Sequence, residues 1–316
     1  MRTTILLTLK QHRMVLWLLV IGTAVLALAT VVGDWAMGAL VESADYKRCM
    51  ALSEIDPACE ALGVKYTLAM IAVAIGGLGP WVLVMLSGLL LGIPLVANEI
   101  DHGTAVLAWS MAPSRSRWFM TRVAILAVVL VICGTVLAFT STQAFVAGRT
   151  DRLDPNLSFD AGSIFGFMVP VRGLVAMAAG MFVGALLGRL FPTVIAGTAL
   201  AAALLWGING WSEMDVHSLP PLWLGAADGE LARGSITTDW YVGDLETGEI
   251  ITQQEFWSRY EDQMQTLDWS TVAQYSMGIP GLVAPDIRGR QAAVLVLAAD
   301  ILLFGALVRV ERRRPY

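Results

Sequence analysis

The residues best placed to act together lie in one short stretch of the chain, between Asn98 and Trp118. This stretch combines carboxylates with arginines, in a chain of 316 residues of which only 15% are charged. Apolar side chains between them include Trp109, and Pro113 is expected to end the helix that they form. Gly103 permits a sharp change of direction at its start. A surface helix of this kind could pass force from a soluble partner into neighbouring helices.

No part of the sequence indicates catalytic chemistry. The three histidines, His12, His102 and His217, lie in separate regions, and there is no His-Glu-x-x-His or Gly-x-Ser-x-Gly motif. No Gly-x-x-x-x-Gly-Lys-Ser/Thr loop is present to bind nucleotide phosphates. No Cys or His lies at ligand spacing from another, so we predict no metal site. A net charge of −5 provides no basic surface for nucleic acid. We therefore predict that the chain is not an enzyme.

Two of the three cysteines lie close together between the first two apolar runs. A disulfide between Cys49 and Cys59 would close a short loop, provided that this loop faces an oxidising compartment. Its role would be structural, since it restricts the unfolded states of the loop. Cys133 stands alone inside an apolar run and is interpreted as a small packing residue.

Arg172 and Asp300 are the two ionisable residues placed well inside apolar runs. A lone charge at the bilayer centre costs at least ~2.5–3.5 kcal/mol, so each needs a partner or contact with water. Each lies about nine positions into its run from the same side, which is a depth of about 13 Å along a helix. We predict that they pair, either to fix the packing of two helices or to line a path through the membrane.

Six apolar runs are long enough to cross a bilayer, which takes about 20 residues in a helix. The chain is 56% hydrophobic and has a mean hydropathy of +0.66, which favours the bilayer as its solvent. The expected fold is an all-α integral membrane protein with six transmembrane helices. We place them at 14–33, 80–97, 123–146, 163–188, 190–210 and 292–310, with 67–79 as a kinked or interfacial lead-in to the second.

The positions of the basic residues predict the orientation of these spans. Short loops and both ends of the chain carry most of the Lys and Arg on one side, which places both termini in the cytoplasm. The expected organisation is then a membrane part at 1–210 that includes a cytoplasmic helix at about 99–116, an extracellular cap at 211–291, and the sixth span with its basic tail at 292–316.

The large segment before the last span has the character of soluble protein. Residues 240–248 read as a strand followed by a turn, and Phe256, Tyr260, Met264 and Leu267 repeat at helical spacing. We interpret it as a small cap packed on the helix ends, with substrate binding as the alternative role.

The stretch from Glu99 to Arg122, together with glycines in two of the spans, resembles the permease subunits of ATP-binding-cassette exporters of the type-2 family, particularly the actinobacterial kind. The resemblance rests on a Glu, a Gly-Thr pair, an arginine-rich turn and a basic residue that enters the next span, together with two stretches of spaced glycines. These are Glu99, Gly103-Thr104, Arg115-Ser116-Arg117-Trp118, Arg122, Gly88 to Pro94, and Gly180, Gly184 and Gly188. The family usually has Lys at the position of Arg122, and this change keeps the charge.

The resemblance implies a permease that forms the translocation path as a dimer, with an identical or a related chain, in the inner membrane of a bacterial cell. Residues 99–116 would contain the coupling helix, which docks on an ATP-binding cassette subunit. ATP and Mg would be bound by that partner, and this chain would carry no cofactor. The residues expected to couple the two subunits are Glu99, Asp101, Gly103, Thr104, Trp109, Arg115, Arg117 and Arg122.

Two other functions are consistent with six spans. An ion-coupled secondary transporter could relay protons through Arg172 and Asp300, although no internal repeat of hydropathy is visible. A membrane sensor or scaffold could use segment 211–291 as an extracellular receptor. Neither function requires an ATPase partner, and membrane lipids surround the chain in every case.

Overall fold

The computed structural model describes residues 8–51, 57–104, 114–147, 157–159, 166–226, 235–244, 249–260 and 272–313. By its internal contacts the chain divides into two compact units. The first unit comprises residues 1–150, 163–209 and 291–316, and the second comprises 151–162 and 210–290.

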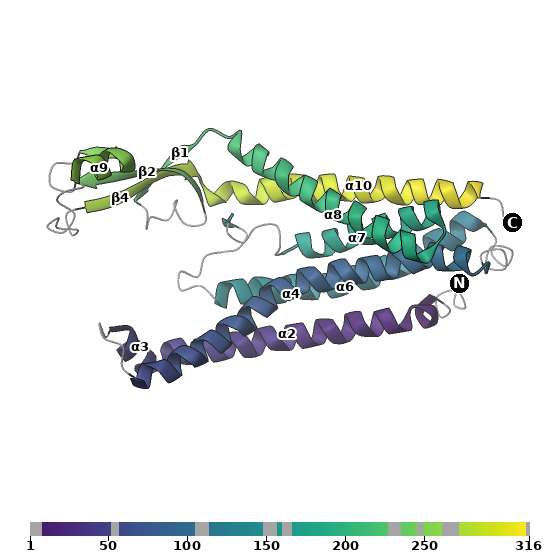
Figure 1. Cartoon of the computed structure of the whole chain (residues 1–316), viewed down its shortest axis with the longest axis horizontal. Coiled ribbons are helices and arrows are strands. Elements are labelled where there is room, and N and C mark those ends of the chain that lie inside the picture. The colour runs from purple at the N-terminus through teal and green to yellow at the C-terminus, as the bar shows by residue number, and fades with distance from the viewer. Residues whose placement is uncertain are drawn as a thin grey trace. The chain divides into compact units, whose positions relative to one another are not determined.

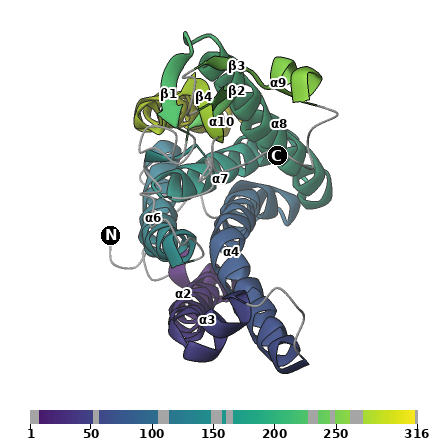
Figure 2. The same ribbon diagram turned by 90° about the vertical axis from the view of Figure 1, so that its left-hand side faces the viewer.

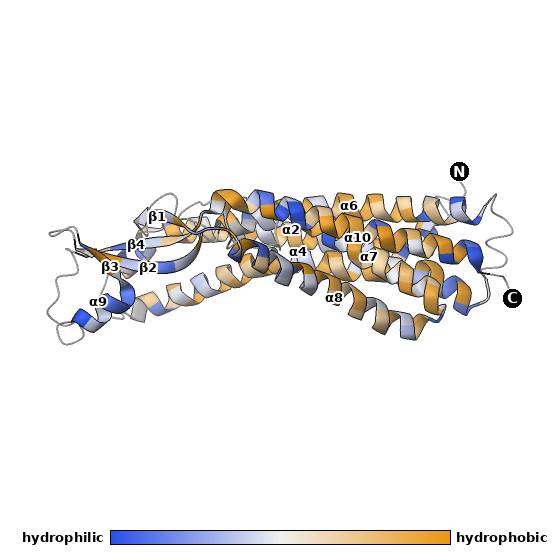
Figure 3. Ribbon diagram, turned by 90° about the horizontal axis from the view of Figure 1, so that it is seen from above, coloured by the Kyte–Doolittle hydropathy of each residue, from blue (hydrophilic) through white to orange (hydrophobic). Residues whose placement is uncertain are grey.

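Six helices in the described part of the chain are long and apolar enough to cross a membrane, which confirms the number of spans predicted. Figure 1 shows them, and Figure 3 shows the apolar residues that run along α6, α7 and α10. They are α2 (Arg13–Glu42), α4 (Pro57–Asp101), α6 (Arg115–Ala147), α7 (Met168–Leu187), α8 (Leu190–His217) and α10 (Ala284–Arg312).

The second span differs from the sequence prediction, because α4 continues without a break from Pro57 to Asp101. Residues 67–79 are therefore part of the helix and not a separate lead-in. Pro80 and Pro94 lie inside it. Neighbouring helices and local adjustment of the backbone allow proline within a membrane helix, where it would break a helix in water. With 45 residues, α4 is about 68 Å long and exceeds the ~30 Å hydrocarbon core of a bilayer.

The centre of the first unit is α7, which packs on both α4 and α6. Of the 18-residue apolar stretch of α7, 72% of the residues are buried, whereas 17% are buried in the corresponding stretch of α2. The contact between α4 and α7 is close because glycines lie in the interface. A Cβ atom at Gly92 of α4 would overlap the carbonyl oxygen of Met177 of α7. Small residues let two membrane helices bring their backbones together and gain dispersion contacts. The pair α4–α7 is thus the closest-packed part of the unit.

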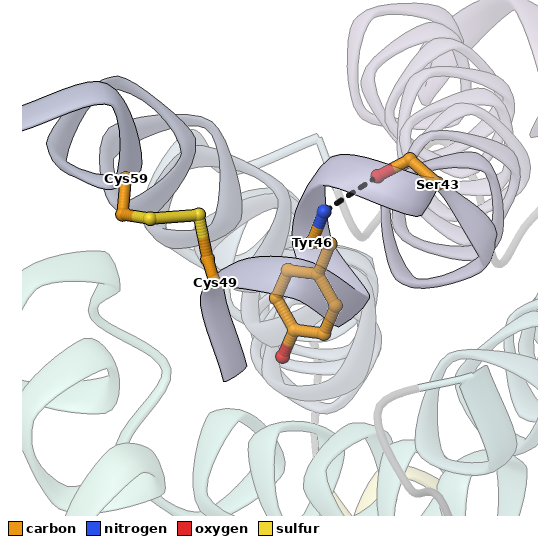
Figure 4. The surroundings of a disulfide bond; sticks show 4 residues. All are labelled: Ser43, Tyr46, Cys49 and Cys59. Atoms are coloured by element: carbon orange, nitrogen blue, oxygen red, sulfur yellow. Dashed lines mark hydrogen bonds between the residues drawn. A yellow bond between two sulfur atoms is a disulfide. The ribbon is translucent and has the colours of Figure 1, made fainter. Parts of the chain in front are cut away.

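The connection between α2 and α4 is a short helical hairpin with a disulfide. Helix α3 (Ala44–Ala51) begins after Ser43, whose hydroxyl accepts a hydrogen bond from the backbone N–H of Tyr46 at 3.2 Å. A disulfide joins Cys49 to Cys59 in the first turn of α4 (Figure 4). The rings of Tyr46 and Tyr66 also stack, 5.8 Å apart. These contacts fix α3 to the start of α4.

The second unit contains a β-sheet, which corrects the all-α prediction to a mostly helical fold with a sheet inserted before the last helix. The four strands are antiparallel in the order β1-β4-β2-β3. They are β1 (Leu222–Ala226), β2 (Ile236–Asp244), β3 (Ile250–Thr252) and β4 (Val272–Ile279). Helix α9 (Gln253–Tyr260) contacts β2 and β3 (Figure 2).

Part of this insert agrees with its sequence pattern. The strand expected to start at Trp240 lies within β2, and the helical spacing of Phe256 and Tyr260 corresponds to α9. Met264 and Leu267 lie outside the described residues. A small core forms where Val216, Ile279 and Ile287 meet. The second unit therefore has a hydrophobic cluster of its own, to which the sheet and the ends of α8 and α10 contribute.

Candidate functional site

The candidate site is built around the carboxylate of Glu99, in the last turn of α4. Its side chain is buried and accepts hydrogen bonds from three other side chains. Gln11 Nε2 and Arg122 Nη1 donate to Oε1 at 2.9 and 3.0 Å, and Thr104 Oγ1 donates to Oε2 at 2.9 Å. The lead-in to α2, the end of α4 and the start of α6 meet at this one carboxylate. We call these four residues the Glu99 cluster.

Arg122 supplies the charge that balances Glu99. Only 2% of its side chain is exposed, and its guanidinium carbon lies 4.4 Å from the centre of the Trp118 ring. Trp118 and Arg122 are four residues apart on α6 and so lie on the same side of the helix. An ion pair this deeply buried is stable only when both charges are present and hydrogen-bonded. The cluster is therefore sensitive to the loss of either charge.

A tight turn after α4 folds Thr104 back onto Glu99. Gly103 has φ of +68°, in the left-handed region that favours glycine and commonly ends helices. The N–H of Gly103 donates to the carbonyl oxygen of Ile100 at 3.1 Å, which closes the turn. Glycine at this position thus allows the Thr104 hydroxyl to complete the shell around the carboxylate.

His12 also lies beside the cluster, immediately before α2. Its side chain is only 5% exposed. Burial, followed by repulsion from the Arg122 guanidinium, lowers the pKa of His12 to about 4, so the imidazole is neutral at pH 7. Gln11 and His12 are not among the site residues predicted from the sequence. A polar pair directly before an apolar run reads as an ordinary flank, so the sequence contains no specific signal for them.

Two further contacts at this end of the helices involve residues from the predicted set. Asp101 Oδ2 accepts a hydrogen bond at 3.2 Å from the backbone N–H of Leu190, the first residue of α8. A carboxylate is favourable there because the N-terminus of a helix carries partial positive charge. Arg115 Nη1 donates to the carbonyl oxygens of Arg313 at 2.6 Å and Glu311 at 3.3 Å, at the end of α10.

The structure brings together only some of the eight residues predicted to couple subunits. Those that form or shape the Glu99 cluster are Glu99, Gly103, Thr104 and Arg122. Asp101 and Arg115 contact other helices, as described above. Arg117 is exposed, and Trp109 lies outside the described residues, as do residues 105–113 of the helix predicted over 99–116. That helix stays a prediction.

The predicted partners Arg172 and Asp300 do not meet in the described structure of this chain. Arg172 is 2% exposed, and its Nη2 donates to Asn209 Oδ1 on α8 at 2.8 Å. Ala299 occupies the buried face of α10, and Asp300, which follows it, is exposed. Consecutive residues on a helix point about 100° apart, so a similar depth in the membrane does not bring the two charges together.

Most of the membrane-spanning part of the chain matches a known protein family. Residues 20–212 match the family described as ABC-2 membrane transporter related, which is more than half of the chain. The chain belongs to this family. No curated protein and no solved structure matches it. The matched region of this ABC-2-related protein includes Glu99, Thr104 and Arg122.

Family membership defines the general role of the ABC-2-related chain. It is a multi-pass membrane protein related to ABC-2 transporters, with six helices in its described part that could span a membrane. Within the part of the chain that the structure describes, no group of three or more His, Cys, Asp or Glu could hold a metal ion. Within the described residues, the contacts of the Glu99 cluster hold three helices together at one end.

Proposed function

We propose that this chain is the membrane-spanning permease of an ATP-driven exporter. Two permease chains, identical or related, would form the path across the inner membrane of a bacterial cell. Both termini would be cytoplasmic, in agreement with the positive-inside distribution of arginines. ATP and Mg would be bound by separate ATP-binding cassette subunits. Membership of the ABC-2-related family supports the permease role, and the absence of a phosphate-binding loop from the sequence is consistent with a separate ATPase.

The observation that carries this proposal is the buried ion pair between Glu99 and Arg122. It lies where α4 gives way, through residues 105–113, to the start of α6. A short connection that touches an ATPase can move the spans only if its ends are firmly attached to them. The Glu99 cluster provides such an attachment at the α4 end, and the contacts of Arg115 with α10 provide one at the α6 end.

The attachment reaches most of the helices in the first unit. Gln11 joins the lead-in of α2 to α4, Asp101 joins α4 to α8, and Arg115 joins α6 to α10. A displacement of residues 105–113 by a partner would therefore be shared among five spans. A secondary transporter would have no use for such a connection on the cytoplasmic side, so the ATP-driven reading is preferred.

The test is affinity purification of the tagged chain in mild detergent, with identification of the proteins that accompany it. We expect a stoichiometric soluble ATPase whose hydrolysis rate changes on binding the permease. Deleting residues 103–112 should abolish the association, and Glu99→Gln should weaken it. Glu311→Gln is the matched control, because it removes an exposed carboxylate at the same end of the helices.

Folding must be separated from docking in this experiment. Each variant is therefore compared with the parent for yield and for elution as a single species in size-exclusion chromatography. A well-folded chain that purifies alone, while a control transporter keeps its ATPase, would reject the proposal. It would favour an ion-coupled carrier or a membrane sensor.

A further inference from the structure

At the end of α10, Arg313 contacts two other helices. Its backbone carbonyl accepts the 2.6 Å hydrogen bond from Arg115, the first residue of α6. Its own guanidinium donates from Nη1 to the carbonyl oxygen of Ala185, in the last turn of α7, at 3.1 Å. Arg313 thus bridges α6 and α7 while it continues the chain from α10.

The guanidinium fits a space that the backbone of α7 leaves for it. Helix α7 ends at Gly188, whose φ of +64° lies in the left-handed region. A Cβ atom at Gly188 would lie only 2.6 Å from Nη2 of Arg313, so any larger residue would displace the side chain. The last carbonyls of a helix carry partial negative charge and favour a cation. Steric fit and charge therefore both place Arg313 at the end of α7.

This contact connects the start of α6 to the most buried helix of the first unit. Arg115 begins the span that follows residues 105–113, while Glu99 lies in the last turn of the span that precedes them. Helix α7 in turn packs closely on α4 at Gly92. The two ends of the connection are therefore linked through the α4–α7 pair, the first end directly and the second through Arg313.

We propose that Arg313 is a positioning residue that locks the first turn of α6 to the ends of α7 and α10. A push on the connection before α6 then moves these three helices together. Without this contact, α6 moves alone and the movement of the connection is not passed on to α7 and α10. This inference rests on the proposed function, and it adds a residue outside the matched family region of 20–212 and outside the set predicted from the sequence.

The test uses the full chain with its copurified ATPase in lipid nanodiscs. Arg313→Ala removes the guanidinium, Arg313→Lys keeps a single donor, and Arg312→Ala is the matched control because it removes an exposed arginine one residue away. Hydrogen exchange of residues 114–120 and 184–190 reports the lock itself. The amount of bound ATPase and the kcat of ATP hydrolysis report its use.

We expect Arg313→Ala to speed amide exchange in both segments and to reduce the permease-dependent change in kcat by about tenfold, since hydrogen bonds of charged groups are worth about that factor or more. The amount of bound ATPase should stay constant, because the docking segment is intact. Arg313→Lys should recover part of the effect, and Arg312→Ala should behave like the parent. A merely structural role would lower yield and binding together with kcat.

The inference is wrong if Arg313→Ala and Arg312→Ala give the same exchange, or if exchange rises while kcat keeps its full response to the permease. Its failure differs from that of the proposed function. If the ATPase still binds, only the lock is rejected. If no ATPase accompanies the chain, the proposed function is rejected and the role of Arg313 in coupling falls with it.

Discussion

Replacing Glu99 by Gln should destabilise the first unit, because it leaves the Arg122 guanidinium buried without its counter-charge. Arg122 is 2% exposed and Glu99 is 6% exposed, so water can compensate neither charge. Removing one partner of a buried ion pair costs about 3–5 kcal/mol. Gln keeps the shape of Glu and one acceptor oxygen, which places the expected loss near the lower limit. We expect the free energy of unfolding to fall by about 3 kcal/mol.

The assay is SDS-induced unfolding in mixed micelles, followed by the fluorescence of the 11 tryptophans. A double-mutant cycle with Glu99→Gln, Arg122→Gln and both together isolates the pair from other effects of each change. The hydrogen bond of a charged pair predicts a coupling energy of at least about 1.5 kcal/mol. Glu311→Gln, an exposed change at the same end of the helices, should leave the unfolding curve unchanged.

Two results would refute this reasoning. One is a Glu99→Gln chain as stable as the parent, which would mean that the carboxylate is not needed to balance Arg122. The other is additivity of the two single changes within about 0.5 kcal/mol, the agreement expected of independent sites. In either case the Glu99 cluster would not be the attachment that the proposed function requires.

Three further predictions concern other parts of the first unit. Gly92→Leu should prevent close packing of α4 on α7 and lower the yield of folded protein, measured by size-exclusion chromatography, whereas Gly38→Leu, at a glycine with open space around it, should not. Cys49→Ser should cost about 3 kcal/mol of local stability by the loop-closure estimate, seen as faster proteolysis of the α3 hairpin; reductant should affect the parent and not the variant. Acidification should destabilise the packing around His12, because its pKa of about 4 when packed lies below the 6.5 of the free side chain. This stability is fully present above pH 6.5 and is lost progressively toward pH 4, by up to about 3 kcal/mol, as SDS unfolding at pH 7.5 and pH 5 will measure.

Each of these predictions has a distinct contrary result. Normal folding of Gly92→Leu would show that α4 and α7 can separate without loss. Equal proteolysis of the parent with and without reductant would mean that the disulfide contributes nothing to the hairpin. For the histidine, His12→Gln should flatten the dependence of stability on pH, and an unchanged slope would assign the effect to another group.

The sequence predicted the number of spans because that signal is physical and local. A run of about 20 apolar residues has few alternatives to a membrane helix, and six such runs were found. Residues 67–79 were placed differently because Gly76, Gly77, Gly79 and Pro80 together suggest a break. The structure keeps one helix there, since packing against α2 decides the outcome and packing is not visible in a sequence.

The site was predicted one residue at a time, and the contacts between residues were not. Glu99 at the end of one span and Arg122 near the start of the next were both selected, but the ion pair between them was not predicted. The Gln11 contact joins residues 88 positions apart, and no periodicity indicates it. Arg172 was assigned to Asp300 by depth alone, whereas the direction of each side chain around its helix gives it Asn209.

The unbroken length of α4 has a mechanical consequence. One end of this helix holds Glu99, and the other is fixed by the disulfide to α3. If α4 moved as a rigid body of about 68 Å, a tilt of about 10° about one end would move its other end by about 12 Å. Small rotations at the Glu99 cluster are thus magnified at the hairpin, which makes α4 a lever arm. The disulfide-closed tip, far from the cluster, is where a spin label should report the largest displacement when the cluster is perturbed.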